Sequence, residues 1–475
     1  MGITLIVVLT YVGQYDTSIN GFNPTRWYND EWAARVLNEF QMVLVVSWSD
    51  LISRSIFSLG LLMTTTSMKE LLYRYSRSEN QIGDIKLTPV TKFQEVMIQT
   101  AKGPVALDRK RRFPAVHMLR VLNRGVHALF LIWGFLVLAL HIQASMQPTL
   151  PQCLLQVRPW GVSSPSCYLV GLDCHRLNIS GKRDEVDSLW HEFGGSSVVM
   201  MLIRHCPSLE VPDVFNEFHQ IHGLKVYNST IVQWRASAAI THTNHPLLAS
   251  VLLLHVNMSD GLLPAGFQSS DFPRHLYDFE MCVTNLRELP DDLYTKWNPG
   301  SQIFIEYSQL RTVPTALLHL AAGFFSLTGN AISDLPAELF EMEGVTHLMI
   351  GDTAIRDLPH NVTRLSSTLA SVSLTNTNIS YFWSWTDQLL QHKSAAPFPT
   401  PILAGGSVYC EEYQQVVECK ATSFSVLPSV DYSTTLMAPA NARSGAISTF
   451  VDCSPYFGGP LYPLATEDLN NGVRK

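Results

Sequence analysis

An apolar pattern that returns every 22 to 24 residues restricts the fold of this chain more than any other feature. The segments "LTGNAISDLPAELF" (327–340) and "IGDTAIRDLPHNV" (350–362) place apolar residues and a proline at the same positions, although few letters agree. Each copy begins at an apolar residue with another apolar residue two positions before it, and such alternation is typical of a half-buried strand. A unit this short leaves its apolar face uncovered unless a neighbour stacks on it. The pattern therefore predicts a solenoid of stacked repeats.

The same marker position can be followed back through the chain. The markers, each the second apolar residue of a short strand, are Cys174, Ile203, Val226, Leu254, Met281, Ile305, Leu327, Ile350 and Leu374. Three residues after most markers comes a small polar position, which holds Cys206, Ser229, Asn257, Thr284, Ser308, Asn330, Thr353 and Thr377. An apolar residue follows two positions later, and a proline comes after it at Pro290, Pro314, Pro336 and Pro359.

This pattern resembles the leucine-rich repeat, L-x-x-L-x-L-x-x-N-x-L followed by a less regular return segment. The match is strong from about 279 to 379 and looser from about 169 to 278, where steps of 27 to 29 residues indicate inserted loops. The resemblance implies an α/β solenoid with a curved parallel sheet on its concave side. It also implies that the small polar side chain bonds backbone inside the turn, so we expect Asn257 to be buried and to carry no glycan.

Both ends of a solenoid need caps, and the cysteines indicate where they lie. All eight cysteines occur at or after Cys153. We therefore predict an N-terminal cap at 145–168, repeats at 169–390, and a cysteine-containing C-terminal cap and tail at 391–475. The caps contain Cys153, Cys167, Cys410, Cys419 and Cys453, so at least one free thiol is expected, and the pairing stays open. We expect Cys174 and Cys206 to be core residues.

The first 144 residues are predicted to form a helical transmembrane region with two or three helices, at about 3–13, 40–63 and 126–144. The segment 126–144 has 19 residues without Asp, Glu, Lys or Arg. At 1.5 Å per residue it reaches about 29 Å, close to the thickness of a hydrocarbon core. The alternative for this segment is a buried core helix. The run at 3–12 is too short to cross alone and lacks the features of a signal peptide.

The segment 40–63 contains two charged residues, Asp50 and Arg54, four positions apart and so on one helical face. An internal pair of this kind is tolerable in a span where a lone charge is expensive. The candidate intramembrane pair is either a structural pair or a contact for another membrane protein; a helix at the interface is the further alternative.

Charge predicts the orientation. Residues 69–125 hold 12 Lys/Arg against 5 Asp/Glu, whereas residues 145–475 hold 18 against 30. Basic loops stay in the cytoplasm, so 69–125 is predicted to be cytoplasmic and 145–475 extracellular at the plasma membrane. On this topology, residues 13–32 lie outside too. The cysteines and the sequons, all after residue 150, agree. Among the sequons Asn361 is the favoured glycosylation site, followed by Asn178, Asn228 and Asn378.

The sequence contains none of the common catalytic motifs. It has no G-x-x-x-x-G-K-[ST], no G-x-S-x-G, no H-E-x-x-H and no C-x-x-C. Basic patches with interleaved aromatic residues are also absent from the acidic part. We therefore expect no enzyme activity, no cofactor, no metal and no nucleic-acid partner.

The concave strand positions are the predicted binding surface. They change from cationic to acidic to small hydroxyl residues along the chain: His175, Arg204, Lys225, Tyr227, His255, Glu280, Phe304, Glu306, Ser326, Thr328, Ser373 and Thr375. Each residue alone is more simply a solvated strand position. As a surface, they suit a protein, peptide or glycan ligand.

The expected function is that of a membrane-anchored, receptor-like or adhesion protein without a catalytic domain. Any signal then passes through a co-receptor. The alternatives are a surface or cell-wall scaffold without a specific ligand, and a fragment of a longer receptor.

Overall fold

The chain forms two compact units, each described here by itself. The computed structural model describes residues 2–43, 48–83, 112–392, 398, 400–426, 429–455 and 458–473. One unit comprises residues 1–13 and 37–143, and the other comprises residues 14–36 and 144–475. A segment from near the start of the chain, 14–36, therefore belongs to the same unit as the repeats.

Long helices make up the first unit. They are α1 (Gly2–Tyr11), α2 (Asp30–Val43, which begins in the other unit), α3 (Trp48–Gly83) and α4 (Arg112–Ser145). The predicted span at 40–63 falls on the end of α2 and the start of α3, and residues 44–47 lie outside the described residues. The side chain of Asp50 lies outside them too, so its pairing with Arg54 stays a prediction. Of the predicted cytoplasmic loop, residues 84–111 are not described.

Within the described residues, Arg124–Ser145 of α4 is the one helical stretch long and apolar enough to cross a bilayer. None of its apolar window is buried. Leu129, Ile132 and Trp133 are 62–67% exposed. The alternative of a buried core helix is therefore wrong for this stretch.

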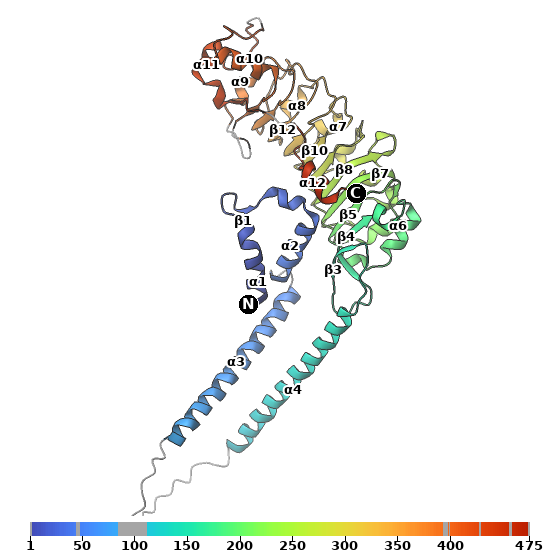
Figure 1. Ribbon diagram of the computed structural model, residues 1–475, viewed down its shortest axis with the longest axis vertical. Helices are drawn as coiled ribbons and strands as arrows, with labels where there is room; N and C mark the ends of the chain where they lie inside the picture. The colour runs from blue at the N-terminus through green and yellow to red at the C-terminus, as the bar shows by residue number, and fades with distance from the viewer. Residues whose placement is uncertain are drawn as a thin grey trace, which may run out of the picture. The chain divides into compact units, whose positions relative to one another are not determined.

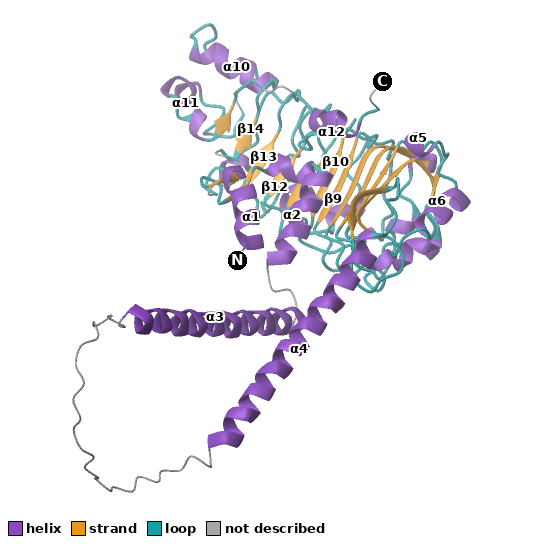
Figure 2. Cartoon of the chain, turned by 60° about the horizontal axis from the view of Figure 1, so that its bottom comes forward, coloured by secondary structure: helices purple, strands orange, loops and turns teal. Residues whose placement is uncertain are grey.

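One large, mostly parallel sheet forms the second unit (Figures 1 and 2). Its strands are β3 (Cys153–Val157), β4 (Ser166–Asp173), β5 (Met200–Arg204), β6 (Leu209–Glu210), β7 (Gly223–Gln233), β8 (Ser250–Met258), β9 (Asp278–Cys282), β10 (Gln302–Glu306), β11 (Phe324–Ser326), β12 (His347–Met349), β13 (Ser371–Ser373), β14 (Ile402–Leu403) and β15 (Val451–Asp452). They follow one another in chain order, except that β6 pairs only with β7. The pair β3–β4 is antiparallel and closes the first end.

Short helices occupy the return segments and the ends. They are α5 (Cys174–Leu177), α6 (Arg183–Trp190), α7 (Thr315–Leu318), α8 (Glu338–Glu341), α9 (Thr386–Leu389), α10 (Val408–Val417), α11 (Pro439–Ser444) and α12 (Leu464–Asn471). Single 3₁₀ turns serve in other repeats, such as η4 (Asp213–Glu217), η5 (Ala236–Ala238), η7 (Ala265–Phe267) and η8 (Leu293–Thr295). This alternation of strand and return is the predicted α/β solenoid.

Strand register agrees with most of the predicted markers. Ile203 pairs with Val226, and Met281 pairs with Ile305. The apolar position two residues earlier is also aligned, from Ile303 to Phe325 and on to Leu348 and Val372. These side chains are at most 2% exposed and belong to one continuous core. The repeats therefore share a core that no single unit could build.

Two markers are wrong. Val226 pairs with Leu253, so Leu254 faces the concave side. The small polar position of this unit then falls on buried Val256, and Asn257 is exposed. The expectation of a buried Asn257 without glycan is thus wrong on burial. In the first unit Ile203 pairs with Leu172, and Cys174 begins helix α5.

A left-handed residue follows the last concave-facing position of the successive strands. It is His205, Asn228, His255, Val283, Tyr307, Gly329, Asp352, Asn376 and Gly406, with φ between 43° and 77°. The chain turns there towards the convex side. Asparagine, aspartate and glycine tolerate this conformation best, whereas a β-branched residue such as Val283 is strained.

Asn330 shows what the small polar position does. Its amide nitrogen donates to the carbonyl oxygens of Ile305 at 2.6 Å and Leu327 at 2.8 Å, and its oxygen accepts from the backbone N–H of Leu310 at 3.2 Å. The residue is 2% exposed. It thus satisfies backbone groups that water cannot reach.

We expect Asn330→Ala to lower the free energy of unfolding by about 3 kcal/mol, because each buried backbone group left unpaired costs about 1–3 kcal/mol. Urea unfolding of the detergent-solubilised chain measures this. Thr353 occupies the same position one repeat later and donates only to the carbonyl of Ile350. Thr353→Ala is therefore the matched control, and an equal loss for both variants would contradict the special role of Asn330.

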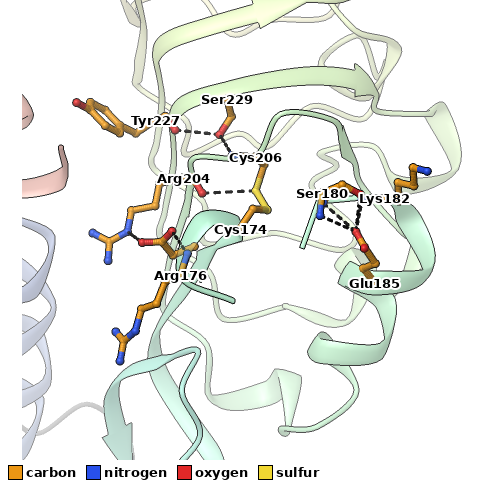
Figure 3. Close-up of a disulfide and its surroundings, with 11 residues drawn as sticks. Cys174, Arg176, Ser180, Lys182, Glu185, Arg204, Cys206, Tyr227 and Ser229 are labelled. Carbon is orange, nitrogen blue, oxygen red and sulfur yellow. Dashed lines mark hydrogen bonds and ion pairs between the residues drawn. A yellow bond between two sulfur atoms is a disulfide. The ribbon is translucent and has the colours of Figure 1, made fainter. Parts of the chain in front are cut away.

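Three disulfides connect the ends of the solenoid: Cys153–Cys167, Cys174–Cys206 and Cys410–Cys453. The first and third lie in the predicted caps. The second contradicts the prediction that Cys174 and Cys206 are unpaired core residues, and it joins α5 to the end of β5 (Figure 3). Buried Cys282 and exposed Cys419 are free thiols.

Candidate binding surface on the concave face

Most predicted site residues share the concave face of the sheet. Strand alternation places Arg204, Lys225, Tyr227, Glu280, Phe304, Glu306, Ser326 and Ser373 opposite the core, and Thr328 and Thr375 follow directly after their strands. His175 is different, because it lies exposed in α5 rather than on a strand. His255 occupies the left-handed position after Leu254.

Two segments of the chain cover the middle of this face. The N-terminal segment (14–36) contains the hairpin β1 (Tyr15–Asp16) and β2 (Gly21–Phe22), and the 3₁₀ turn η2 (Pro24–Tyr28), which Asn23 caps. The C-terminal segment (458–473) contains α12, which lies against the middle strands in Figure 1. The sequence analysis did not predict either contact.

An apolar cluster holds the two segments on the sheet. Tyr227, Leu252, Leu254 and Cys282 form it together with Tyr462, apart from the core of the repeats, and Tyr28 and Leu464 pack against it. The rings of Tyr28 and Tyr462 meet edge to face, with centroids 4.8 Å apart. The segments therefore contact each other as well as the sheet.

Lys225 is the charged centre of this contact. Its Nζ donates to Asp30 and to the backbone carbonyl of Tyr28, both at 3.0 Å, and to Glu467 at 2.9 Å. The side chains of Lys225, Asp30 and Glu467 are at most 7% exposed. Burial would lower the pKa of Lys225, but the two carboxylates outweigh it and raise that pKa. Lys225 thus stays charged, and it connects both segments to β7.

Glu467 satisfies its remaining acceptor sites within the C-terminal segment. Its Oε1 accepts from the amide of Asn471 at 2.6 Å, and its Oε2 accepts from the hydroxyl of Tyr462. Asn471 in turn accepts from Arg204, at 2.6 Å. Every polar group of this cluster is therefore paired, as a buried charge requires.

Beside the lysine lies a group of buried acids. Burial raises the pKa of Glu306 to about 7 and that of Asp278 to about 6. Burial, then the neighbouring Asp278, also raises the pKa of Glu280. Within the described residues, Oδ1 of Asp278 and Oε2 of Glu280 are buried and accept no hydrogen bond. One proton shared by these two carboxyls, which are two positions apart on β9, would pair both atoms.

Glu306 receives the C-terminal segment directly. Its Oε2 accepts from the backbone N–H of Leu461 at 2.9 Å, while its Oε1 accepts from Ser326 at 2.5 Å. Tyr227 donates to Asp468 at 2.8 Å, and His255 lies 3.2 Å from the same carboxylate. Predicted binding residues are thus occupied by the chain itself.

The concave face stays open towards the C-terminal repeats. A cavity of about 230 Å³ lies there, and it is lined by Thr328, Met349, Ser373, Thr375, Phe398, Leu403, Gly405, Asp452, Ser454, Pro455, Gly459 and Leu461. Three predicted site residues, Thr328, Ser373 and Thr375, contribute hydroxyls to it. The other walls are mainly apolar, a combination typical of ligand sites.

No group of three or more His, Cys, Asp or Glu side chains in the described part of the chain is arranged to hold a metal ion. The five sequon asparagines Asn178, Asn228, Asn257, Asn361 and Asn378 are all exposed. Burial therefore does not separate Asn361 from the others as a glycosylation site.

By its fold, the chain is a leucine-rich-repeat protein, and the aligned strands and core described above carry this assignment. No protein-family model matches the sequence. No curated protein matches it either.

Solved structures similar to this chain are leucine-rich-repeat proteins. One, from Leptospira interrogans, has 12% identity and a TM-score of 0.40 over 61% of this chain and 62% of its own length. The repeat domain of the type III effector XopL has 16% identity and a TM-score of 0.30, over 42% and 76%. An internalin from Listeria monocytogenes has 15% identity and a TM-score of 0.29, over 44% and 56%. The chain thus spans less than two thirds of the Leptospira protein, and these similarities concern the fold alone.

Proposed function

We propose that this chain is a membrane-anchored extracellular binding protein, receptor-like or adhesive, that takes a protein, peptide or glycan ligand on its concave face. The observation that carries the proposal is the open cavity beside Ser373 and Thr375, on a rigid parallel sheet. Sites built on strands hold their side chains in fixed positions. A signalling co-receptor is part of the proposal, because the sequence contains no catalytic signature.

Three features support the placement outside the cell. Three disulfides are typical of extracellular or secreted domains. The stretch Arg124–Ser145 exposes apolar side chains along its length, which suits contact with lipid. The N-terminal segment belongs to the same unit as the repeats, which agrees with a topology that has both on the same side of the membrane.

Accessibility on intact cells tests this placement. With an epitope tag after Lys475, we expect added protease to remove the repeats, and added glycosidase to shift the mobility of the chain. Protection of residues 145–475 until the cells are permeabilised would contradict an extracellular position.

Ligand binding is tested by filling the cavity. We expect Ser373→Phe to abolish saturable binding of extracellular protein or glycan fractions to cells that display the chain, because the new ring occupies the cavity. Ser333→Phe is the matched control, since Ser333 is exposed and outside the cavity lining. Equal binding by both variants would favour the scaffold function, which needs no ligand site.

A further inference from the structure

The covered part of the concave face has the properties of a peptide-binding site that is already occupied. Arg204, Lys225, Tyr227 and His255 come from three neighbouring strands, and each contacts Glu467, Asp468 or Asn471 of α12. The contacts are made by side chains at the first, second and fifth positions of one short stretch. The sheet thus recognises a particular order of acidic and amide groups.

The C-terminal segment is separate from the structure it covers. The core of the repeats ends at Val451 and Cys453 and includes no residue of 458–473. Tyr462 and Leu464 belong to the separate concave cluster. The disulfide Cys410–Cys453 fixes the chain just before the segment begins. Removing the segment would therefore uncover the concave face without opening the core or the cap.

The contacts also match the requirements of a ligand rather than of a structural strut. The anchor is an aromatic residue, Tyr462, in an apolar cluster, and charged pairs surround it. Backbone N–H groups of Leu461 and Tyr462 reach Glu306, at 2.9 and 3.4 Å. A central aromatic anchor with buried charge pairs is the arrangement in which few residues supply most of the binding energy.

We propose that the concave face binds an acidic peptide segment of a partner protein, and that the C-terminal segment is its intramolecular substitute. The recognised chemistry is a tyrosine, followed five and six residues later by two carboxylates and nine residues later by an amide, as at Tyr462, Glu467, Asp468 and Asn471. This inference rests on the proposed binding function and adds the ligand class. A tethered segment competes at an effective concentration of the order of millimolar, so a partner must displace it.

The experiment uses the full chain with a protease site inserted between Pro455 and Gly458. The probe is a fluorescent synthetic peptide of residues 458–473. We expect the cleaved chain to bind the probe saturably, and the uncleaved chain to bind it roughly tenfold more weakly or worse, because its own segment competes. A probe carrying E467Q and D468N should bind the cleaved chain roughly tenfold more weakly or worse, because it lacks the carboxylates that Lys225, Tyr227 and His255 face.

A second variant covers the case in which the cleaved segment does not dissociate. In the uncleaved chain, E467Q with D468N weakens the native occupant, so probe binding should rise; E411Q, which changes an exposed residue of α10, should not change it. The proposal fails if the folded, cleaved chain does not bind the probe and the double variant does not gain binding. It also fails if the probe's carboxylates make no difference. These measurements use purified protein, so they are independent of membrane placement and of the Ser373 cavity.

Discussion

Lys225→Met lowers the free energy of unfolding of the repeat unit by about 3–5 kcal/mol, the cost of removing one partner from a buried ion cluster. The substitution keeps the length of the side chain but leaves Asp30 and Glu467 as neighbouring buried carboxylates without a cation. This loss is a large part of the 5–15 kcal/mol that stabilises a typical domain. Chemical unfolding of the detergent-solubilised chain, followed by tryptophan fluorescence, measures it.

The expected structural result is release of both covering segments. Limited proteolysis should cut the Lys225→Met variant near residues 14–36 and 458–473, at protease concentrations that leave the unmodified chain intact. Glu467→Gln should have a smaller effect, because the amide keeps the shape and Lys225 keeps Asp30.

Lys296→Met is the matched control. Lys296 pairs with Asp292 at 2.8 Å within one turn, and the carboxylate is 62% exposed. Exposed pairs contribute about 0–1 kcal/mol. A similar loss for Lys225→Met and Lys296→Met would show that the buried cluster contributes no more than a surface pair.

The second large effect concerns pH. Glu306 has a folded-state pKa of about 7 against an ordinary value of 4.5, and Asp278 has about 6 against 3.8. Because burial raises both pKa values, their contribution to stability is complete below about pH 4 and is lost as the pH rises through 6 and 7. The loss is about 3 kcal/mol for each carboxyl, at 1.36 kcal/mol for each pKa unit.

We therefore expect the midpoint of thermal unfolding to fall between pH 5 and pH 8. Asp30 and Glu280 contribute in the same direction, since their pKa values are raised too, by burial first. Below about pH 4 the opposite sign takes over, because hydrogen bonds hold the pKa of exposed carboxylates such as Glu185 and Glu341 below its usual range. Maximum stability should lie near pH 5.

Glu306→Gln tests the origin of this dependence. The amide oxygen still accepts from Leu461 but no longer ionises, so the fall between pH 6 and pH 8 should become shallower. Asp292→Asn, on the convex side, is the control. An unchanged profile for Glu306→Gln, or a midpoint that rises with pH, would contradict a buried acidic group under the covering segments.

The repeats could be predicted from the sequence because a solenoid repeats its physical constraint in every unit. Beyond Met281 the strands are short and alternate strictly, so the register is unambiguous. It failed at "SVLLLHVNM", where four consecutive apolar residues, Val251 to Leu254, allow either face to be the core. It failed at Cys174 because the chain leaves the sheet as a helical turn one residue earlier than the pattern indicated.

The covering of the concave face could not be predicted in this way. The ion pairs of Lys225 join residues 195 and 242 positions apart, and neither Asp30 nor Glu467 belongs to a periodic pattern. A buried lysine and two buried glutamates on one sheet face looked like a graded polar surface, because residue type alone does not reveal what covers it. Which of these residues are free for a ligand was therefore predicted wrongly for the middle strands.

The distance in sequence between Lys225 and Glu467 also sets an order of events during synthesis. The ribosome adds 242 residues between them. At about 5–20 residues per second, the lysine waits roughly 12–50 s for its second carboxylate. Throughout that interval the nascent solenoid relies on contacts between adjacent coils alone. Chaperones of the secretory route would thus meet this molecule with its inner wall still bare.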